Sequence, residues 1–232
     1  MTIRISAIAC LMLVWLAGIG LDPASAQLGR RDRDTADRAS SLDRPERVAN
    51  LRVDEVVAKL QLKPGDIVAD VGSGTGAFSI AMAKAIAPGG TLYAVDIDQK
   101  LLDVVAGKAK AAGLTNVKTV LGEYDDPKLP VKTVDVAFFH RVLHMIEHRQ
   151  AYVNATATYM KPDGRIVIIE KNPADADDWM WLKQSDVDTW MAALAFYPAQ
   201  HFGVFDDRYF VVYQRPYGNS VLLKKKGGPE KK

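Results

Sequence analysis

Short apolar runs alternate with amphipathic segments along most of this chain, and that alternation constrains the fold more than any other feature. Apolar runs of strand length occupy residues 66–71, 91–96, 117–121, 134–139 and 165–170. Apolar residues recur at helical spacing over residues 45–60, 78–87, 100–112 and 149–159. Strands that alternate with helices are typical of βαβ units, in which helices cover both faces of a parallel sheet.

The pattern changes after residue 170. A segment rich in Trp and Met, residues 179–194, precedes apolar runs at 202–205 and 209–213. The short polar break at 206–208 between these runs is typical of a hairpin, and residues 161–164 (Lys-Pro-Asp-Gly) predict a turn. We therefore predict an α/β fold: a Rossmann-like, doubly wound, mostly parallel sheet of seven strands that ends in an antiparallel hairpin.

The first 26 residues have the features of a signal peptide. Arg4 precedes an uncharged, mostly apolar run over residues 5–21, and the small residues Ala24, Ser25 and Ala26 suit a signal peptidase. We expect cleavage after Ala26 and export to the periplasm or the medium. The alternative is an uncleaved membrane anchor, because the apolar run is longer than many signal sequences contain.

Charge and composition divide the rest of the chain into three parts. Residues 27–45 are polar and predict a disordered linker, residues 46–216 hold the folded domain, and residues 217–232 form a basic, disordered tail. The tail contains five lysines and one glutamate after residue 223, so contact with an anionic membrane surface is an alternative to simple solvation. The domain itself is net negative, which argues against a nucleic-acid partner. The oligomeric state is left open.

The single cysteine, Cys10, lies inside the predicted signal peptide. The mature chain would therefore contain no thiol, which suits an oxidising compartment. It also excludes mechanisms that use a cysteine nucleophile or a thiolate metal ligand.

A glycine-rich loop lies between the first predicted strand and the helix after it. Residues 70–76 read Asp-Val-Gly-Ser-Gly-Thr-Gly, and glycines at such a junction let the backbone approach a ligand at a helix N-terminus. Asp96 ends the second strand, where a carboxylate can accept both hydroxyls of a ribose, and Glu123 follows the third strand. Because all three loops leave the carboxyl ends of neighbouring strands, we expect them to form one nucleotide-type site.

The glycine spacing separates two families that bind such ligands. Dinucleotide oxidoreductases carry G-x-G-x-x-G, whereas this chain has G-x-G-x-G with Asp70 two residues ahead. That spacing, and the terminal hairpin, resemble class I S-adenosylmethionine-dependent methyltransferases, in particular those of ubiquinone and menaquinone biosynthesis. The resemblance runs from about residue 56 to residue 213. Matching segments include residues 62–66, 68–76, 93–96, 116–117, 122–123, 142–144 and 160–170.

The resemblance implies S-adenosyl-L-methionine as the cofactor and assigns roles to its binding residues. The methionine portion would be held by Asp70, Gly72, Ser73, Gly74, Thr75 and Gly76. Asp96, with Ile97 beside it, would bind the ribose hydroxyls, and Glu123 would bind the adenine amine with Tyr124 next to it. The implied activity is methyl transfer to a small, preferably apolar acceptor that the sequence does not identify. The alternative is an exported protein that binds the cofactor without turnover.

Candidate catalytic residues follow the fourth predicted strand. His140, Arg141 and His144 lie there, and His140 is the first choice for a general base or for binding next to the cofactor. A base is needed only if the acceptor must lose a proton, and a structural histidine is the alternative. The spacing of His140, His144 and His148 invites a metal-site interpretation, but apolar residues intervene and we expect no metal.

Aromatic and Met side chains gather between the fifth strand and the hairpin. They are Trp179, Met180, Trp181, Trp190 and Met191. They would either line the acceptor pocket, which would favour a flat or apolar acceptor, or pack a helix on the sheet.

Overall fold

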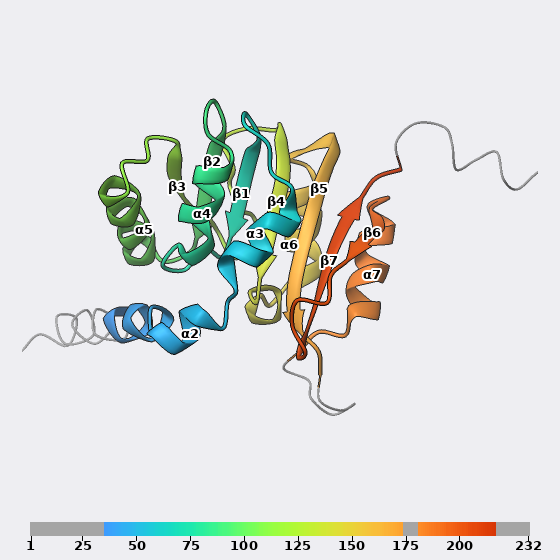
Figure 1. Cartoon of the computed structure of the whole chain (residues 1–232). Coiled ribbons are helices and arrows are strands. Elements are labelled where there is room, and N and C mark those ends of the chain that lie inside the picture. The colour runs from blue at the N-terminus through green and yellow to red at the C-terminus, as the bar shows by residue number, and fades with distance from the viewer. Residues whose placement is uncertain (1–34, 174–180, 217–232) are drawn as a thin grey trace, which may run out of the picture.

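The computed structural model describes residues 35–173 and 181–216, and a sheet of seven strands forms its centre (Figure 1). The strands are β1 (Ile67–Val71), β2 (Thr91–Asp96), β3 (Val117–Leu121), β4 (Val134–His140), β5 (Met160–Lys171), β6 (Tyr197–His201) and β7 (Arg208–Gln214). Their order is β3-β2-β1-β4-β5-β7-β6, with β1 to β5 parallel and β7 antiparallel to both β5 and β6. The predicted fold class is confirmed.

The order of the strands places the ligand site. The chain builds outward from β1 to β2 and β3, and then returns to add β4 on the other side of β1. The crossovers therefore leave opposite faces at the β1/β4 boundary and open a crevice at the carboxyl ends of these strands. The glycine loop leaves β1 at this point, and the candidate histidines leave β4.

Helices cover both faces of the sheet. They are α2 (Pro45–Ala49), α3 (Val53–Leu60), α4 (Ala77–Ala85), α5 (Gln99–Ala111), α6 (Arg149–Ala157) and α7 (Gln184–Ala193), with a 3-10 turn at Leu143–Met145. Val56, Met82 and Val105 from α3, α4 and α5 pack on one face, whereas Val153 and Met191 from α6 and α7 pack on the other. Strands buried on both faces need apolar residues at consecutive positions, and the sequences of β1, β2 and β4 supply them.

The first strand of the hairpin lies earlier in the chain than predicted. It spans Tyr197–His201, not residues 202–205, although β7 falls where it was expected. Every residue of β6 is exposed, so this edge strand has no buried face to reveal it, and its Pro198 is unusual in a strand. The aromatic run at 202–205 packs from a loop instead, with the Phe202 ring 4.9 Å from the Phe210 ring.

Two other local predictions need correction. The turn expected at residues 161–164 lies inside β5, where the pairing with β4 jumps from Met160 to Arg165 and the intervening residues bulge from the ladder. The helical spacing over residues 45–60 corresponds to two helices, α2 and α3, because Arg52 between them adopts a left-handed conformation with φ 49°.

The expected linker is partly ordered. Residues 35–42 form a helix, contrary to the disorder predicted from their polar composition. Hydrogen bonds to distant side chains hold this segment: the Thr35 hydroxyl donates to Asp98 over 3.2 Å, and Asp43 accepts from Thr75 over 2.6 Å and from Lys108 over 2.8 Å. The segment therefore lies against the glycine loop and α5.

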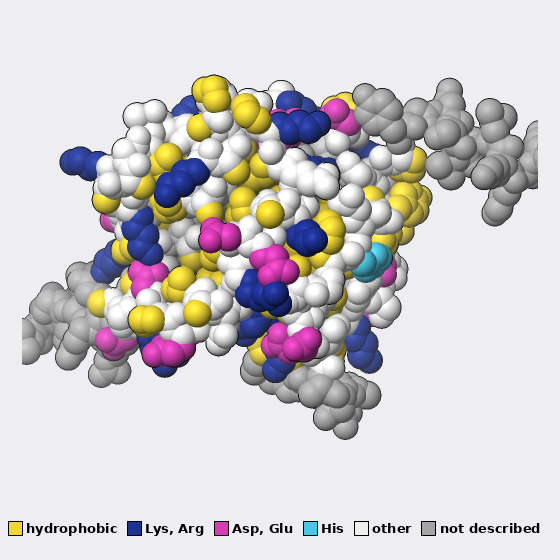
Figure 2. All heavy atoms as spheres, in the orientation of Figure 1, with side chains coloured by type: hydrophobic (Ala, Val, Ile, Leu, Met, Phe, Trp, Pro, Cys, Tyr) yellow, Lys and Arg dark blue, Asp and Glu magenta, His cyan; other side chains and the backbone are white. Residues whose placement is uncertain are grey.

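The predicted signal peptide, residues 27–34 of the predicted linker, and the basic tail lie outside the described residues. Within the described ranges, no helix is both long and apolar enough to cross a membrane. On the face shown in Figure 2, acidic and basic side chains are interspersed, so neither sign of charge dominates that face.

Candidate active site

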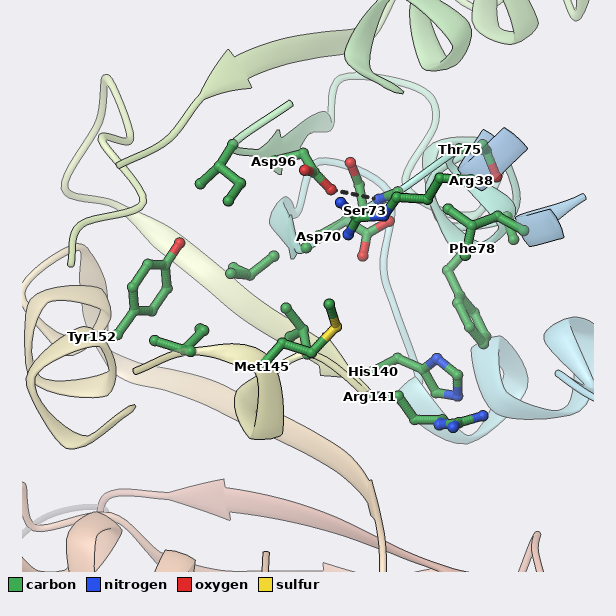
Figure 3. A pocket seen from close by; sticks show the side chains of 18 of the residues that line it. Arg38, Asp70, Ser73, Thr75, Phe78, Asp96, His140, Arg141, Met145 and Tyr152 are labelled. Atoms are coloured by element: carbon green, nitrogen blue, oxygen red, sulfur yellow. Dashed lines mark hydrogen bonds between the residues drawn. The ribbon is translucent and has the colours of Figure 1, made fainter. Parts of the chain in front are cut away.

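A cavity of about 440 Å³ opens at the carboxyl ends of β1, β2 and β4 (Figure 3). This volume lies within the range of small-molecule and cofactor sites. Ten of the predicted site residues line it: Asp70, Gly72, Ser73, Gly74, Thr75, Asp96, Ile97, Glu123, Tyr124 and His140. Gly76 lies behind the cavity wall, where it precedes α4 with φ 78°. The crevice predicted from the topology is therefore present and contains the predicted loops.

The glycine loop makes a tight turn around the end of β2. The backbone N–H groups of Gly72 and Ser73 both donate to the Val95 carbonyl, over 2.8 and 2.9 Å, and this fixes the loop against β2. Gly72 has a left-handed conformation with φ 70°, which a residue with a side chain adopts only at a cost. The Ser73 hydroxyl is buried in the cavity wall and has no hydrogen-bond partner among the described residues. A polar ligand group in the cavity would satisfy it.

Asp70 is a buried carboxyl beside the glycine loop. It is 3% exposed and accepts a hydrogen bond from the Ser79 hydroxyl of α4. Burial raises the pKa of Asp70 to about 7, against the lowering effect of the Ser79 bond, and the neighbouring Asp96 raises it further. A cationic ligand group next to Asp70 would favour its charged form.

Asp96 is held in place by the backbone on both sides. Its Oδ2 accepts from the Gly74 N–H over 2.9 Å and its Oδ1 accepts from the Asp98 N–H over 3.1 Å. Each carboxylate oxygen can accept a further hydrogen bond, and Asp96 lines the cavity. The carboxylate is thus oriented in advance to receive two neighbouring hydroxyl groups.

The part of the cavity wall formed by the loops after β2 and β3 is exposed. Glu123 forms an ion pair with Lys128 over 3.2 Å, and Tyr124 is 81% exposed. Ile97 is also largely exposed, so this wall offers an apolar surface and one carboxylate at the mouth. Such a wall suits a flat ring that one polar group orients.

His140 lies at the opposite end of the cavity from Asp96, as Figure 3 shows. Its ring is 4.8 Å from the Phe78 ring and 6.5 Å from the Phe205 ring, and its buried Nε2 has no partner among the described residues. Burial lowers the pKa of His140 well below its usual value, and the positive charges of Arg208, Arg141 and Arg47 lower it further. The imidazole is therefore neutral at physiological pH.

His144 does not reach the cavity. Its Nδ1 is 2.9 Å from Glu170 Oε2, and the fully buried Glu170 also accepts the Leu143 N–H over 2.8 Å. Trp181 covers the other side of the His144 ring at 4.5 Å. The prediction that His144 is catalytic is not supported by this position, because the bond to Glu170 keeps its ring away from the cavity. The described residues include no cluster of three or more His, Cys, Asp or Glu side chains arranged to hold a metal.

Several residues that line the cavity were missed in the sequence. Arg38, Leu42, Arg47 and Leu51 come from the N-terminal segment, and Met145, Ile146 and Tyr152 come from the stretch after β4. The N-terminal group reaches the site through long-range contacts that no local pattern reveals. An arginine-rich composition before residue 50 was the one available signal.

Two interpretations were open for the Trp and Met residues after β5, and those that are described do not line the cavity. Met191 is fully buried against the sheet, and Trp190 packs on the same cluster. Trp181 instead lies near Arg141, with the guanidinium 5.3 Å from the ring centre. Met191 and Trp190 therefore pack a helix on the sheet, and Trp181 packs beside Arg141 and His144. Trp179 and Met180 lie outside the described residues.

Comparison with known proteins identifies the class to which this fold and site belong. Residues 62–204 match a family described as a methyltransferase domain. The chain belongs to this family, and its membership confirms the resemblance to class I S-adenosylmethionine-dependent methyltransferases and the expected cofactor.

Individual relatives agree with this assignment. The chain is 33% identical over 104 residues to a nocamycin O-methyltransferase of Saccharothrix syringae, covering 45% of this chain and 37% of that protein. It is 28% identical over 117 residues to a demethylmenaquinone methyltransferase of Geobacillus, covering 50% of each. The chain thus spans half or less of the length of these curated relatives.

Solved structures share the fold. A SAM-dependent methyltransferase from Aquifex aeolicus superposes with a TM-score of 0.70 at 22% identity, covering 78% of this chain and 98% of that one. A protein from Bordetella parapertussis described as a possible exported protein gives a TM-score of 0.59 at 16% identity, covering 72% of this chain and 68% of that one.

The pKa of Asp70 predicts a pH dependence for cofactor binding. S-adenosylhomocysteine carries an ammonium group on its amino-acid portion, which the family resemblance places beside Asp70. In the free protein Asp70 has a pKa of about 7, so below pH 7 most molecules carry a protonated Asp70. That proton must be released before Asp70 can pair with the ammonium group. Affinity should therefore fall about tenfold between pH 8 and pH 6, as calorimetry can measure.

Two controls test the assignment to Asp70. The variant Asp70→Asn should bind with little pH dependence, and 5′-methylthioadenosine, which lacks the amino-acid portion, should bind the natural protein equally at both pH values. A wild-type affinity for S-adenosylhomocysteine that is the same at pH 6 and pH 8 would contradict the raised pKa.

His140 predicts a loss of folding stability in acid. Its pKa is lowered in the folded protein, so below the unfolded value of about 6.5 the unfolded chain takes up a proton that the folded chain does not. The stabilisation is present above that pH and is lost as the pH falls, by about 1 kcal/mol between pH 7.5 and pH 5.5. Urea unfolding should show that the wild type loses this much more than His140→Phe. Equal losses in the two proteins would show that His140 titrates normally in the folded state.

Proposed function

We propose that this protein transfers a methyl group from S-adenosylmethionine to a small molecule that binds on the β4 side of the cavity. The observation that carries the proposal is a single cavity that joins the glycine loop, Asp70 and Asp96 to His140 and the apolar residues after β4. One part of the cavity has the groups that suit the cofactor. The other part remains for an acceptor.

The protein contributes mainly position. When bound, the cofactor supplies an electrophilic methyl group for in-line displacement by an acceptor lone pair. Asp96 and the glycine loop hold the nucleoside and amino-acid portions in one orientation, and Met145, Ile146 and Val142 line the space around the acceptor. Holding two reactants in line and keeping water out is worth about 7–11 kcal/mol of activation free energy.

His140 can receive a proton if the acceptor must lose one. Its Nε2 is free of partners among the described residues, and its neutral imidazole has an unprotonated nitrogen. The three nearby arginines disfavour the imidazolium, so His140 would hold such a proton only weakly.

Titration calorimetry tests the proposal directly. The purified protein should bind S-adenosylmethionine and S-adenosylhomocysteine with micromolar dissociation constants and should bind NAD⁺ at least 100-fold more weakly. Radiolabelled methyl transfer to a panel of hydroxyl-bearing small molecules then separates turnover from simple binding. A folded protein that binds neither cofactor form would remove the basis for the assignment.

We also propose that the protein is exported. The support is the leader pattern of residues 1–26, with its charged start, apolar run and Ala-Ser-Ala end. Cell fractionation followed by N-terminal sequencing should find a mature chain that begins at Gln27 outside the cytoplasm. A full-length chain in the membrane fraction would support the anchored alternative, and a full-length chain in the cytoplasm would exclude both.

A further inference from the structure

Three arginines gather around His140, at the end of the cavity that Asp96 does not reach. Arg47 comes from α2, Arg141 from the end of β4 and Arg208 from the start of β7. Arg47 and Arg141 line the cavity, and all three are partly buried. Their proximity shows in the pKa of Arg47, which is lowered by burial and then by the positive charges of Arg141 and Arg208.

Two of these guanidinium groups have no carboxylate partner among the described residues. Arg208 is paired with Asp207 over 3.2 Å, and its guanidinium lies 4.4 Å from the centre of the Phe205 ring. Within the described ranges, Arg47 donates only to the Leu42 carbonyl over 2.9 Å, and the nearby Asp43 is paired with Lys108 over 2.8 Å. The Arg141 Nε is buried and has no hydrogen-bond partner in the described chain.

Unpaired positive charges that lie together at a partly buried site are unfavourable unless an anion joins them. The backbone of Arg141 is also left-handed, with φ 52°, and its N–H is held by the Ile169 carbonyl over 2.8 Å. This non-glycine conformation carries a cost, and it places the guanidinium beside His140 at the cavity (Figure 3). The folded state therefore carries two unfavourable contributions at Arg141. One is its left-handed backbone, and the other is a guanidinium without a carboxylate partner among the described residues.

We propose that Arg47 and Arg141 form a carboxylate-binding site for the methyl acceptor, so that the acceptor is an organic acid with an apolar body. A carboxylate matches the planar donor array of a guanidinium and can be held by two at once. Met145 and Ile146 also line the cavity and would provide the apolar contact. The inference rests on the proposed methyltransferase function and specifies its acceptor class.

The cofactor also has a carboxylate, on its methionine portion, and the test must separate the two sources. Asp70, Ser73 and Thr75 mark where that portion is expected, and Arg38 lies on that side in Figure 3. His140 and Arg141 lie farther along the wall, toward the end of β4. We therefore assign the Arg47–Arg141 site to the acceptor and leave Arg38 to the cofactor side.

A matched pair of probes tests the assignment. Protein saturated with S-adenosylhomocysteine is titrated with 4-hydroxybenzoate and with its uncharged amide, 4-hydroxybenzamide. The carboxylate should bind at least tenfold more tightly than the amide. Arg141→Gln and Arg47→Gln should each abolish that preference, while the affinity for S-adenosylhomocysteine stays within twofold. Arg44→Gln, which removes an exposed arginine outside the cavity, should leave the preference unchanged.

Each contrary result has a distinct meaning. If the natural protein binds both probes equally, or binds neither, the acceptor-acid proposal is wrong. If Arg141→Gln instead weakens S-adenosylhomocysteine more than tenfold but leaves 5′-methylthioadenosine unchanged, the site holds the carboxylate of the cofactor and the proposal also fails. Failure of S-adenosylhomocysteine to bind the natural protein would overturn the proposed function itself, and with it this inference.

Discussion

Replacing Asp96 with alanine is expected to weaken S-adenosylmethionine binding by 100-fold or more. The Asp96 carboxylate is 8% exposed and is oriented by the N–H groups of Gly74 and Asp98. Two charge-assisted hydrogen bonds to ribose hydroxyls at such a site contribute about 1.5–3 kcal/mol each, and both would be lost. Calorimetric titration measures the effect, and 5′-methylthioadenosine should lose affinity to the same extent because it keeps the ribose.

Asp103→Ala is the matched control for that experiment. Asp103 is an exposed carboxylate on α5 that accepts a hydrogen bond from the Gln99 side chain over 2.9 Å and does not line the cavity. Its removal should change folding stability by less than about 0.5 kcal/mol and leave cofactor affinity within a few-fold of the natural value. If the two variants bind the cofactor equally well, Asp96 does not contact the ribose.

The second large effect is expected from Gly72→Ala. An added Cβ at Gly72 would lie 2.3 Å from Val142 Cγ2 and 2.8 Å from Val142 Cβ, so the strand-end loop that carries Val142 must move. The φ of 70° adds about 1–2 kcal/mol of backbone strain, and overpacking of this kind adds about 1–3 kcal/mol more. Because Gly72 belongs to the glycine loop on the cofactor side of the cavity, the variant should also lose most of its cofactor binding.

Gly113→Ala separates the two contributions. Gly113 has nearly the same backbone angle, with φ 67°, but nothing lies within 4 Å of an added Cβ. Its loss of unfolding free energy in urea should therefore report the backbone strain alone, about 1–2 kcal/mol. A Gly72→Ala variant no less stable than Gly113→Ala would mean that Val142 moves aside at no cost.

The buried strands, and the loops placed by the ends of these strands, were predictable from the sequence. Strands β1, β2 and β4 fall within a residue or two of the predicted positions because each is a nearly continuous apolar run that is buried on both faces. The glycine loop and Asp96 were predictable for a related reason. Their places depend on where strands end, and strand ends follow from the same apolar runs. That reasoning also explains why Gly72 and Asp96 reach the same cavity from different strands.

The missed features depend on contacts between distant residues. The helix over residues 35–42 has little apolar periodicity, and polar bonds such as Thr35 to Asp98 position it. Strand β6 is exposed throughout, and its place at the edge of the sheet follows from its pairing with β7. His144 illustrates the same limit within the site, because its orientation is set by Glu170, 26 residues later, and the local sequence does not indicate that partner.

The two walls of the cavity differ in how the chain supplies them. The wall with Asp70, the glycine loop, Asp96 and Glu123 comes from one continuous stretch, β1 through the loop after β3. The facing wall is assembled from the N-terminal segment and the stretch from His140 to Tyr152. Mutations in the second set can reshape one end of the cavity while the first set keeps its own internal bonds. A lineage with this architecture can thus exchange one substrate for another without having to rebuild its means of holding the methyl donor.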